Sequence, residues 1–118
     1  MMPCPLDPTV PVVFVDPTGL GPTRLDQSHA FAVYGEDVEE PFIVVDQRLL
    51  SEAWFTEDHL LVLMAHELAH IRCRSQNEKL ADRIGMLLLL RDGHASAYDL
   101  HRSEYESRLA AGHYRKAA

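Results

Sequence analysis

Residues 57–74 read EDHLLVLMAHELAHIRCR, and the rest of the fold is organised around this stretch. It is apolar on most faces of a helix, which predicts a helix buried in the centre of the domain. Thr56 is expected to cap its N-terminus, before two acidic residues that the helix dipole favours. Because residues four apart lie on one face of a helix, His66 and His70 present two imidazoles to the same point.

The five residues His66-Glu67-Leu68-Ala69-His70 have the zincin arrangement, which is typical of zinc enzymes. The two histidines are the expected metal ligands. Glu67 is the expected catalytic residue, a general base that accepts a proton from a water activated by the metal. The alternative is two ordinary histidines with Glu67 in a helical salt bridge. The position of the motif in the middle of an apolar helix favours the zinc site.

A catalytic zinc ion usually has three protein ligands and one open position, and we expect Glu78 to be the third ligand. On one straight helix, His70 and Glu78 would lie about 12 Å apart, too far to share an ion. The helix must therefore break between them, and residues 75–77 form a polar break. Asp82 shares a helix face with Glu78 and is expected to accept a hydrogen bond from the second ring nitrogen of His66 or His70.

Other roles are possible for some of these residues. Ser75 and Glu78 have the spacing of a capping box, which would use Glu78 to close the N-terminus of the second helix. In that case His94 or His101 is the next choice for the third ligand. Cys73 could bind metal, but we expect it to be a small buried apolar group.

The remaining segments complete an α+β pattern. Short runs rich in β-branched residues predict three strands, over residues 10–16, 28–34 and 41–46. A short polar link between the last two strands favours a hairpin. Two further helices are predicted over residues 77–91 and 95–110. The expected fold is a minimal zincin-like α+β domain over residues 1–118, with a small N-terminal antiparallel or mixed sheet packed on the central helix and two further helices.

Composition excludes some classes of function. The formal charge is −7 and the basic residues are scattered, which argues against nucleic acid as a partner. The apolar runs are too short to span a bilayer, so no membrane partner is expected, and the first residues have no export signal. Two cysteines make no disulfide framework. We therefore expect a cytoplasmic protein.

The stretch from Phe31 to Ile71 resembles the ImmA/IrrE-type metallopeptidases. In that family a strand hairpin leads into the helix with the two histidines. The segment Glu78-Lys79-Leu80-Ala81-Asp82 is similar to the pattern that supplies the third ligand in that family and in other gluzincins. The resemblance implies a zinc metallopeptidase with Zn²⁺ as its cofactor and a peptide or protein as its substrate.

The proposed substrate strand is the third predicted strand. An extended peptide is expected to pair with its backbone, because in zincins this strand is usually the sheet edge beside the active-site helix; its residues are Phe42, Ile43, Val44, Val45 and Asp46. Tyr98, Tyr105 or His101 could stabilise the oxyanion. The alternatives are a catalytically silent zincin-fold module that binds a protein partner, a structural zinc site, or a hydrolase acting on a non-peptide substrate. A regulatory protein partner or a homo-oligomer is also possible.

Overall fold

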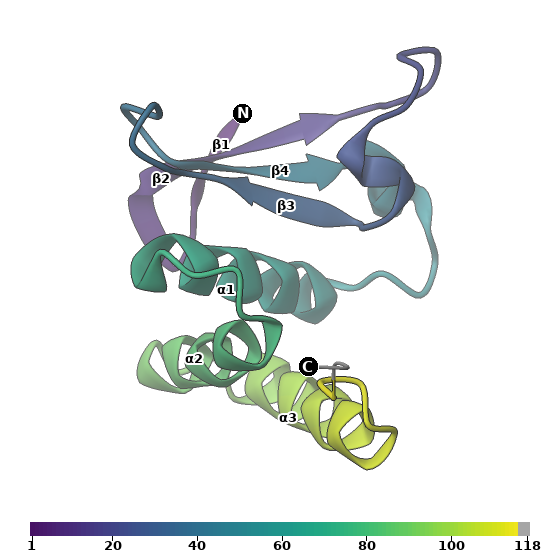
Figure 1. The fold of residues 1–118 in the computed structure, drawn as a ribbon. Coiled ribbons are helices and arrows are strands. Elements are labelled where there is room, and N and C mark those ends of the chain that lie inside the picture. The colour runs from purple at the N-terminus through teal and green to yellow at the C-terminus, as the bar shows by residue number, and fades with distance from the viewer. Residues whose placement is uncertain (116–118) are drawn as a thin grey trace.

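A four-stranded mixed sheet forms the N-terminal half of the protein, whose computed structural model describes residues 1–115. The sheet order is β1-β2-β4-β3 (Figure 1). Strand β2 pairs parallel to β4, whereas the β1–β2 and β3–β4 pairs are antiparallel. The strands are β1 (Met2–Cys4), β2 (Asp7–Val15), β3 (Ala30–Val33) and β4 (Phe42–Asp46).

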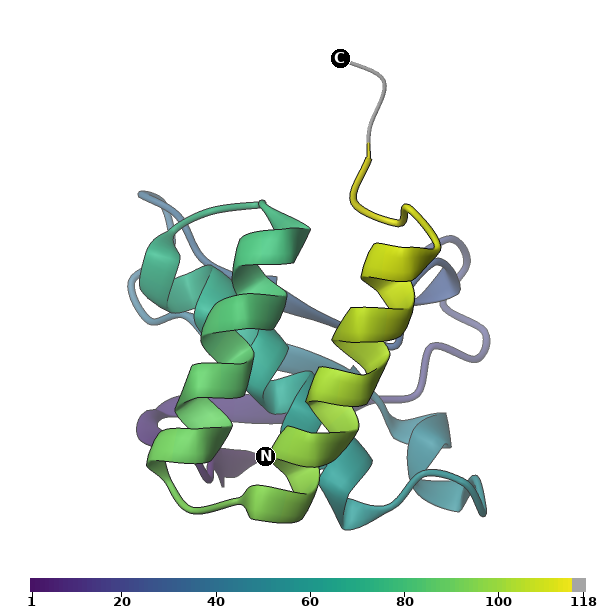
Figure 2. The same ribbon diagram turned by 90° about the horizontal axis from the view of Figure 1, so that it is seen from below.

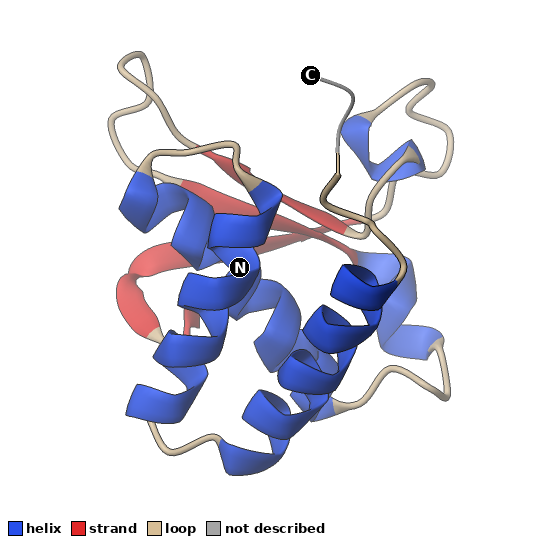
Figure 3. Ribbon diagram, turned by 60° about the horizontal axis from the view of Figure 1, so that its bottom comes forward, coloured by secondary structure: helices blue, strands red, loops and turns tan. Residues whose placement is uncertain are grey.

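Three helices form the C-terminal half and lie on one side of the sheet (Figures 1 and 3). They are α1 (Glu57–Cys73), α2 (Glu78–Arg91) and α3 (Ala95–Ala110), and two short 3-10 helices, η1 (Arg24–Asp26) and η2 (Gln47–Ser51), connect strands and helices. Helix α1 lies between the sheet and the other two helices. These elements confirm the predicted α+β fold class.

The hydrophobic core lies between the sheet and α1 and continues to α2. Side chains that point inward from the strands meet apolar side chains of the helices, and the fully buried ones include Val12, Ile43, Val45, Met64, Leu68 and Leu89. Burial on nearly all sides explains why α1 is apolar over most of its surface. The core therefore holds the helix with the two histidines at the centre of the domain.

A short turn joins α1 to α2 and reverses the chain. Helix α1 ends before Arg74, whose backbone is left-handed with a φ of 46°. Asn77 then caps α2, because its side chain accepts the backbone N–H of Leu80 at 3.0 Å. The cap comes from Asn77, so Glu78 is not needed for a capping box and its carboxylate is free for another role. The predicted break between the helices is thus confirmed.

Helices α2 and α3 form an antiparallel pair. Figure 2 shows them side by side. A tight turn at Gly93 joins the C-terminal end of α2 to the N-terminal end of α3. The C-terminal end of α3 therefore returns to the level of the start of α2. Among the residues that the structure describes, no helix is both long and apolar enough to cross a membrane.

The position of β4 corrects one prediction. Strand β4 lies between β2 and β3, so it is a central strand and cannot accept a peptide at its edge. Its residues 43–46 are all buried, and such a continuous buried run is typical of a strand inside a sheet. The edge strand beside α1 is β3 instead, and the substrate strand predicted over Phe42–Asp46 is wrong for this reason.

Candidate metal centre

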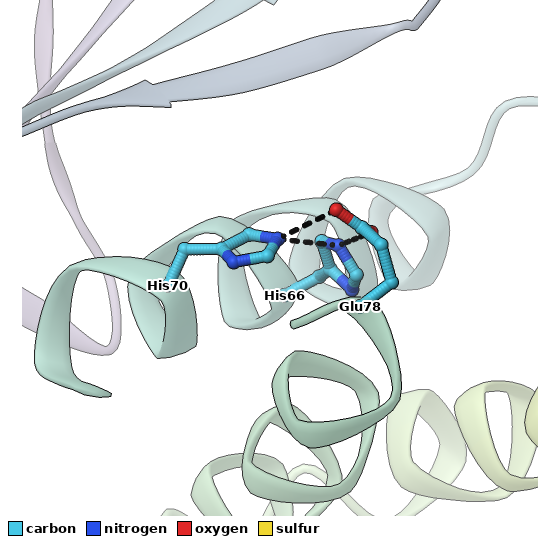
Figure 4. A group of neighbouring side chains, drawn as sticks. All are labelled: His66, His70 and Glu78. Atoms are coloured by element: carbon cyan, nitrogen blue, oxygen red, sulfur yellow. Dashed lines mark hydrogen bonds and ion pairs between the residues drawn. The ribbon is translucent and has the colours of Figure 1, made fainter. Parts of the chain in front are cut away.

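Three side chains from α1 and the start of α2 meet at one point (Figure 4). His66 Nε2 lies 3.1 Å from His70 Nε2 and 2.9 Å from Glu78 Oε2, and His70 Nε2 lies 3.2 Å from Glu78 Oε1. One ligand atom from each residue lies within 4.8 Å of the others. The turn between the helices thus brings Glu78 to the two histidines. On one straight helix Glu78 would be too far from His70 for this contact.

The second nitrogen of each imidazole is held by an oxygen acceptor. Nδ1 of His66 lies 2.7 Å from Asp82 Oδ1, and Nδ1 of His70 lies 2.6 Å from the carbonyl oxygen of Ser75. These contacts assign the proton to Nδ1 in the neutral rings and leave both Nε2 lone pairs directed at the shared point. Two imidazoles and one carboxylate, held in this way, fit a zinc ion with one open position.

The charges at this point are strongly coupled. Burial opposes protonation of His66, but the hydrogen bonds to Asp82 and Glu78 outweigh it and raise its pKa to about 10. The hydrogen bonds from His66 and His70 hold the pKa of Glu78 far below its usual range. A cation is therefore favoured at this point, either as protons on the imidazoles or as a metal ion that replaces them.

Glu67 lies beside these three residues and is only 7% exposed. Burial raises its pKa to about 7, while the nearby charges of His66 and His70 oppose the shift. A carboxylate with a pKa close to neutrality can both accept and release a proton at physiological pH. Its side chain lines the same cleft as the two histidines.

The cleft has a volume of about 600 Å³ and lies between β3, α1 and the ends of α2 and α3. Tyr34, just after β3, lines it, and its hydroxyl is buried without a hydrogen-bond partner among residues 1–115. Sequence reasoning did not find Tyr34. The sequence pattern that could have identified Tyr34 is the alternation of side chains along β3, which puts Ala30, Ala32 and Tyr34 on one face of the sheet.

The open edge of β3 runs along this cleft. The backbone N–H of Asp46 donates to the carbonyl of His29 at 2.9 Å, and β3 pairs antiparallel with β4 from Ala30 onward. Because hydrogen-bonded and non-bonded positions alternate in such a ladder, the backbone groups of Ala30 and Ala32 point to the open edge. Ser28 already donates its hydroxyl to the Ala30 carbonyl at 2.9 Å, so Ala32 offers the free pair of backbone groups.

Asp82 is 2% exposed and has two further hydrogen-bond partners besides His66. Arg108 on α3 lies 3.2 Å from its Oδ2, and the hydroxyl of Tyr114 donates to the same oxygen. Burial raises the pKa of Asp82, but the hydrogen bonds from His66 and Tyr114 and the charge of Arg108 outweigh it and hold the pKa below its usual range. The structure thus brings Asp82 to His66 as expected, and it adds two partners that the sequence did not suggest.

The other candidates from the sequence lie elsewhere. His101 is fully buried behind Asp82, with a 3.9 Å separation between Nε2 and Oδ1, and it does not reach the three ligating side chains. His94 precedes α3 and is not part of the group of described residues that could hold a metal ion. Cys73 is exposed, so the prediction that it is buried is wrong. Neither Tyr98 nor Tyr105 is among the described residues that line the cleft.

Comparison with known proteins gives one match. The model of peptidase family M48 matches residues 20–105, which is more than half of the chain and includes every side chain of the metal-binding group. No curated protein and no solved structure matches the chain. The match supports the expected zincin-like metallopeptidase but does not confirm the resemblance to the ImmA/IrrE-type family.

Proposed function

The chain belongs to peptidase family M48, and from this premise we propose that it is a zinc-dependent metallopeptidase with Glu67 as its general base. The observation that carries the proposal is the convergence of His66, His70 and Glu78 within 4.8 Å, next to a buried glutamate. His66 and His70 would bind zinc through Nε2 and Glu78 through its carboxylate. When bound, zinc would supply a Lewis acid that lowers the pKa of a water molecule and polarises the scissile carbonyl.

The protein side chains would perform the proton transfers. Glu67, buried beside the three ligating side chains, would accept a proton from the attacking water and pass it to the leaving amine. Tyr34 has a buried hydroxyl without a partner in the described part of the chain, and it is our candidate donor to the oxyanion. A buried donor that is left unpaired in the free protein is available to the substrate without first breaking another bond.

The substrate would be an extended peptide paired with the edge of β3. The backbone N–H and carbonyl of Ala32 point outward there, so a peptide strand can add to the sheet beside the metal-binding group. The proposed substrate strand is therefore Ala30–Val33 rather than Phe42–Asp46. A regulatory partner, a homo-oligomer and a cytoplasmic location stay predictions.

The alternative is a module that binds a partner without cleaving it. Glu67 argues against this alternative, because a binding module has no chemical use for a buried carboxylate with a pKa near neutrality beside a metal site. Such a group costs free energy to bury and is typical of catalytic sites.

The test combines metal content with peptide hydrolysis. We expect about one zinc ion per wild-type chain by mass spectrometry, lost in His66→Ala and in Glu78→Ala. Glu67→Gln should keep its zinc and lower kcat for cleavage of an unstructured protein by roughly 10²- to 10⁴-fold. Glu57→Gln, at the exposed start of the same helix, is the matched control and should retain full activity.

Each result bears on a different part of the proposal. A wild-type protein that binds zinc but cleaves nothing across a peptide library would favour the binding module. Undiminished turnover in Glu67→Gln would refute the role of Glu67. A wild-type protein that binds no zinc at all would refute the metallopeptidase itself.

A further inference from the structure

Helix α3 and the turn after it reach back to the metal centre. The antiparallel course of α2 and α3 returns the end of α3 to the level of the start of α2 (Figure 2). Arg108 and Tyr114 contact Asp82 in the first turns of α2. Both residues lie beyond the part of the chain that the family model matches.

Both residues bind one carboxylate. Arg108 Nη1 lies 3.3 Å from Asp82 Oδ1 and 3.2 Å from Oδ2, and the Tyr114 hydroxyl donates to Oδ2. Asp82 Oδ1 in turn lies 2.7 Å from His66 Nδ1. An unbroken chain of contacts thus runs from the C-terminal turn through Asp82 to one of the three ligating side chains.

The two oxygens of Asp82 have different sets of partners. Oδ1 contacts the imidazole of His66 and, at 3.3 Å, Arg108, whereas Oδ2 accepts hydrogen bonds from Arg108 and Tyr114. Because Arg108 and Tyr114 both bind Oδ2, the carboxylate of Asp82 cannot rotate without breaking charge-assisted hydrogen bonds. A fixed carboxylate keeps the His66 proton on Nδ1 and keeps Nε2 directed at Glu78.

The anchoring of the turn depends on the same contact. The side chains of Ala111, His113 and Arg115 are exposed. Tyr114 is half-buried, and its ring lies 5.7 Å from the ring of Tyr105. Tyr114 therefore fastens the end of the described chain to the carboxylate behind the metal centre.

We propose that Arg108 and Tyr114 are positioning residues of the metal centre, which hold Asp82 so that it orients His66 for zinc. The inference rests on the proposed zinc site and deepens it. The coupling also acts in the opposite direction. If the Tyr114–Asp82 contact favours zinc binding, then zinc binding stabilises that contact, because coupling between two sites is reciprocal.

The test measures zinc affinity by competition with a chromophoric chelator on the full chain. Asp82→Asn is expected to weaken zinc binding by about 10- to 100-fold, the usual effect of losing the partner of a ligating histidine. Tyr114→Phe and Arg108→Met should each weaken it by roughly 3- to 10-fold, because they loosen Asp82 without removing it. Arg108→Lys, which keeps the charge, should restore part of the loss.

The double variants separate positioning from general stability. In the Asp82→Asn background, Tyr114→Phe should have no further effect on zinc affinity, because its only route to His66 is already cut. A merely structural role would give the same loss in both backgrounds. Tyr105→Phe and Arg102→Met are matched controls on α3, since neither side chain touches Asp82, and both should bind zinc like the wild type.

Reciprocity gives a second readout that does not depend on activity. Zinc should slow hydrogen exchange in the backbone of residues 111–115 in the wild type but not in Tyr114→Phe. If wild-type protein binds zinc and both Tyr114→Phe and Arg108→Met bind it equally well, the inference is wrong and the proposed function stands. If the wild type binds no zinc, the proposed function itself fails.

Discussion

The buried imidazole of His101 should make the protein less stable in mild acid. His101 is fully buried, and neither ring nitrogen has a hydrogen-bond partner among the described residues. Burial lowers its pKa to about 4, against about 6.5 for an exposed histidine. Between these two values the unfolded chain binds more protons than the folded one, so stability falls as the pH falls.

The size of the effect follows from the two pKa values. At pH 5 the folded imidazole is still about nine-tenths neutral, whereas the unfolded one is almost fully protonated. The linkage relation then gives a loss of about 2 kcal/mol at pH 5 relative to pH 8, and the loss levels off at about 3 kcal/mol below pH 4. This stability is fully present above about pH 6.5.

The substitution His101→Leu removes the titrating group and keeps a similar volume. Urea unfolding of wild type and variant, followed by circular dichroism at pH 8 and pH 5 with a chelator present, gives the free energy of unfolding in each case. The wild type should lose about 2 kcal/mol more than the variant, since other groups cancel in the comparison. Leu100→Ala, a partly buried neighbour on the same helix, should show a deficit that is the same at both pH values. A pH-independent difference between wild type and His101→Leu would refute the reasoning.

Three further predictions concern packing, substrate binding and acid stability. Gly85→Ala should lower the melting temperature, with a net loss of about 1 kcal/mol, because the added Cβ would lie 3.1 Å from His101 Nε2 and 3.2 Å from a backbone carbon of Ala65; a rise in melting temperature would contradict this packing. Ala32→Pro should raise KM for a peptide substrate with little loss of folding stability, because it removes an N–H that points to the open edge of β3; an unchanged KM in steady-state kinetics would exclude pairing at this position. Asp46→Asn should destabilise the protein at neutral pH by roughly 1–3 kcal/mol, because the buried carboxylate is hydrogen-bonded to Arg48. Arg48 also holds the pKa of Asp46 below its usual range, so this stability is present above about pH 4 and is lost as the pH falls below it; chemical unfolding that gives an equal difference between variant and wild type at pH 7 and pH 3 would contradict this.

The local elements follow closely from the sequence. The predicted helix over residues 57–74 is α1, Glu57–Cys73, and the helices predicted over 77–91 and 95–110 are α2 and α3. Their ends are set by nearby residues, such as the side chains of Thr56 and Asn77, which accept the first free N–H groups of α1 and α2. Strand β1 was not predicted, because a strand of three residues that includes Pro3 and is followed by Pro5 carries too little pattern.

The geometry of the candidate metal centre was also within reach of the sequence. The spacing of His66 and His70 is set by the pitch of one helix, and the polar break before Asn77 allowed Glu78 and Asp82 to fold back toward them. These inferences use geometry over a few turns of helix, where the chain has few alternatives.

Other features depend on contacts between distant parts of the chain. Strand pairing put β3 rather than β4 at the sheet edge, and an alternating or continuous apolar pattern does not say which strand will be its neighbour. The return of α3 along α2 joined Tyr114 to Asp82 across 32 residues. Helical spacing is a local property, so the residues that could hold a metal can be identified from the sequence. The open sheet edge at β3 and the contacts that hold His66 come from long-range packing, which no local pattern encodes.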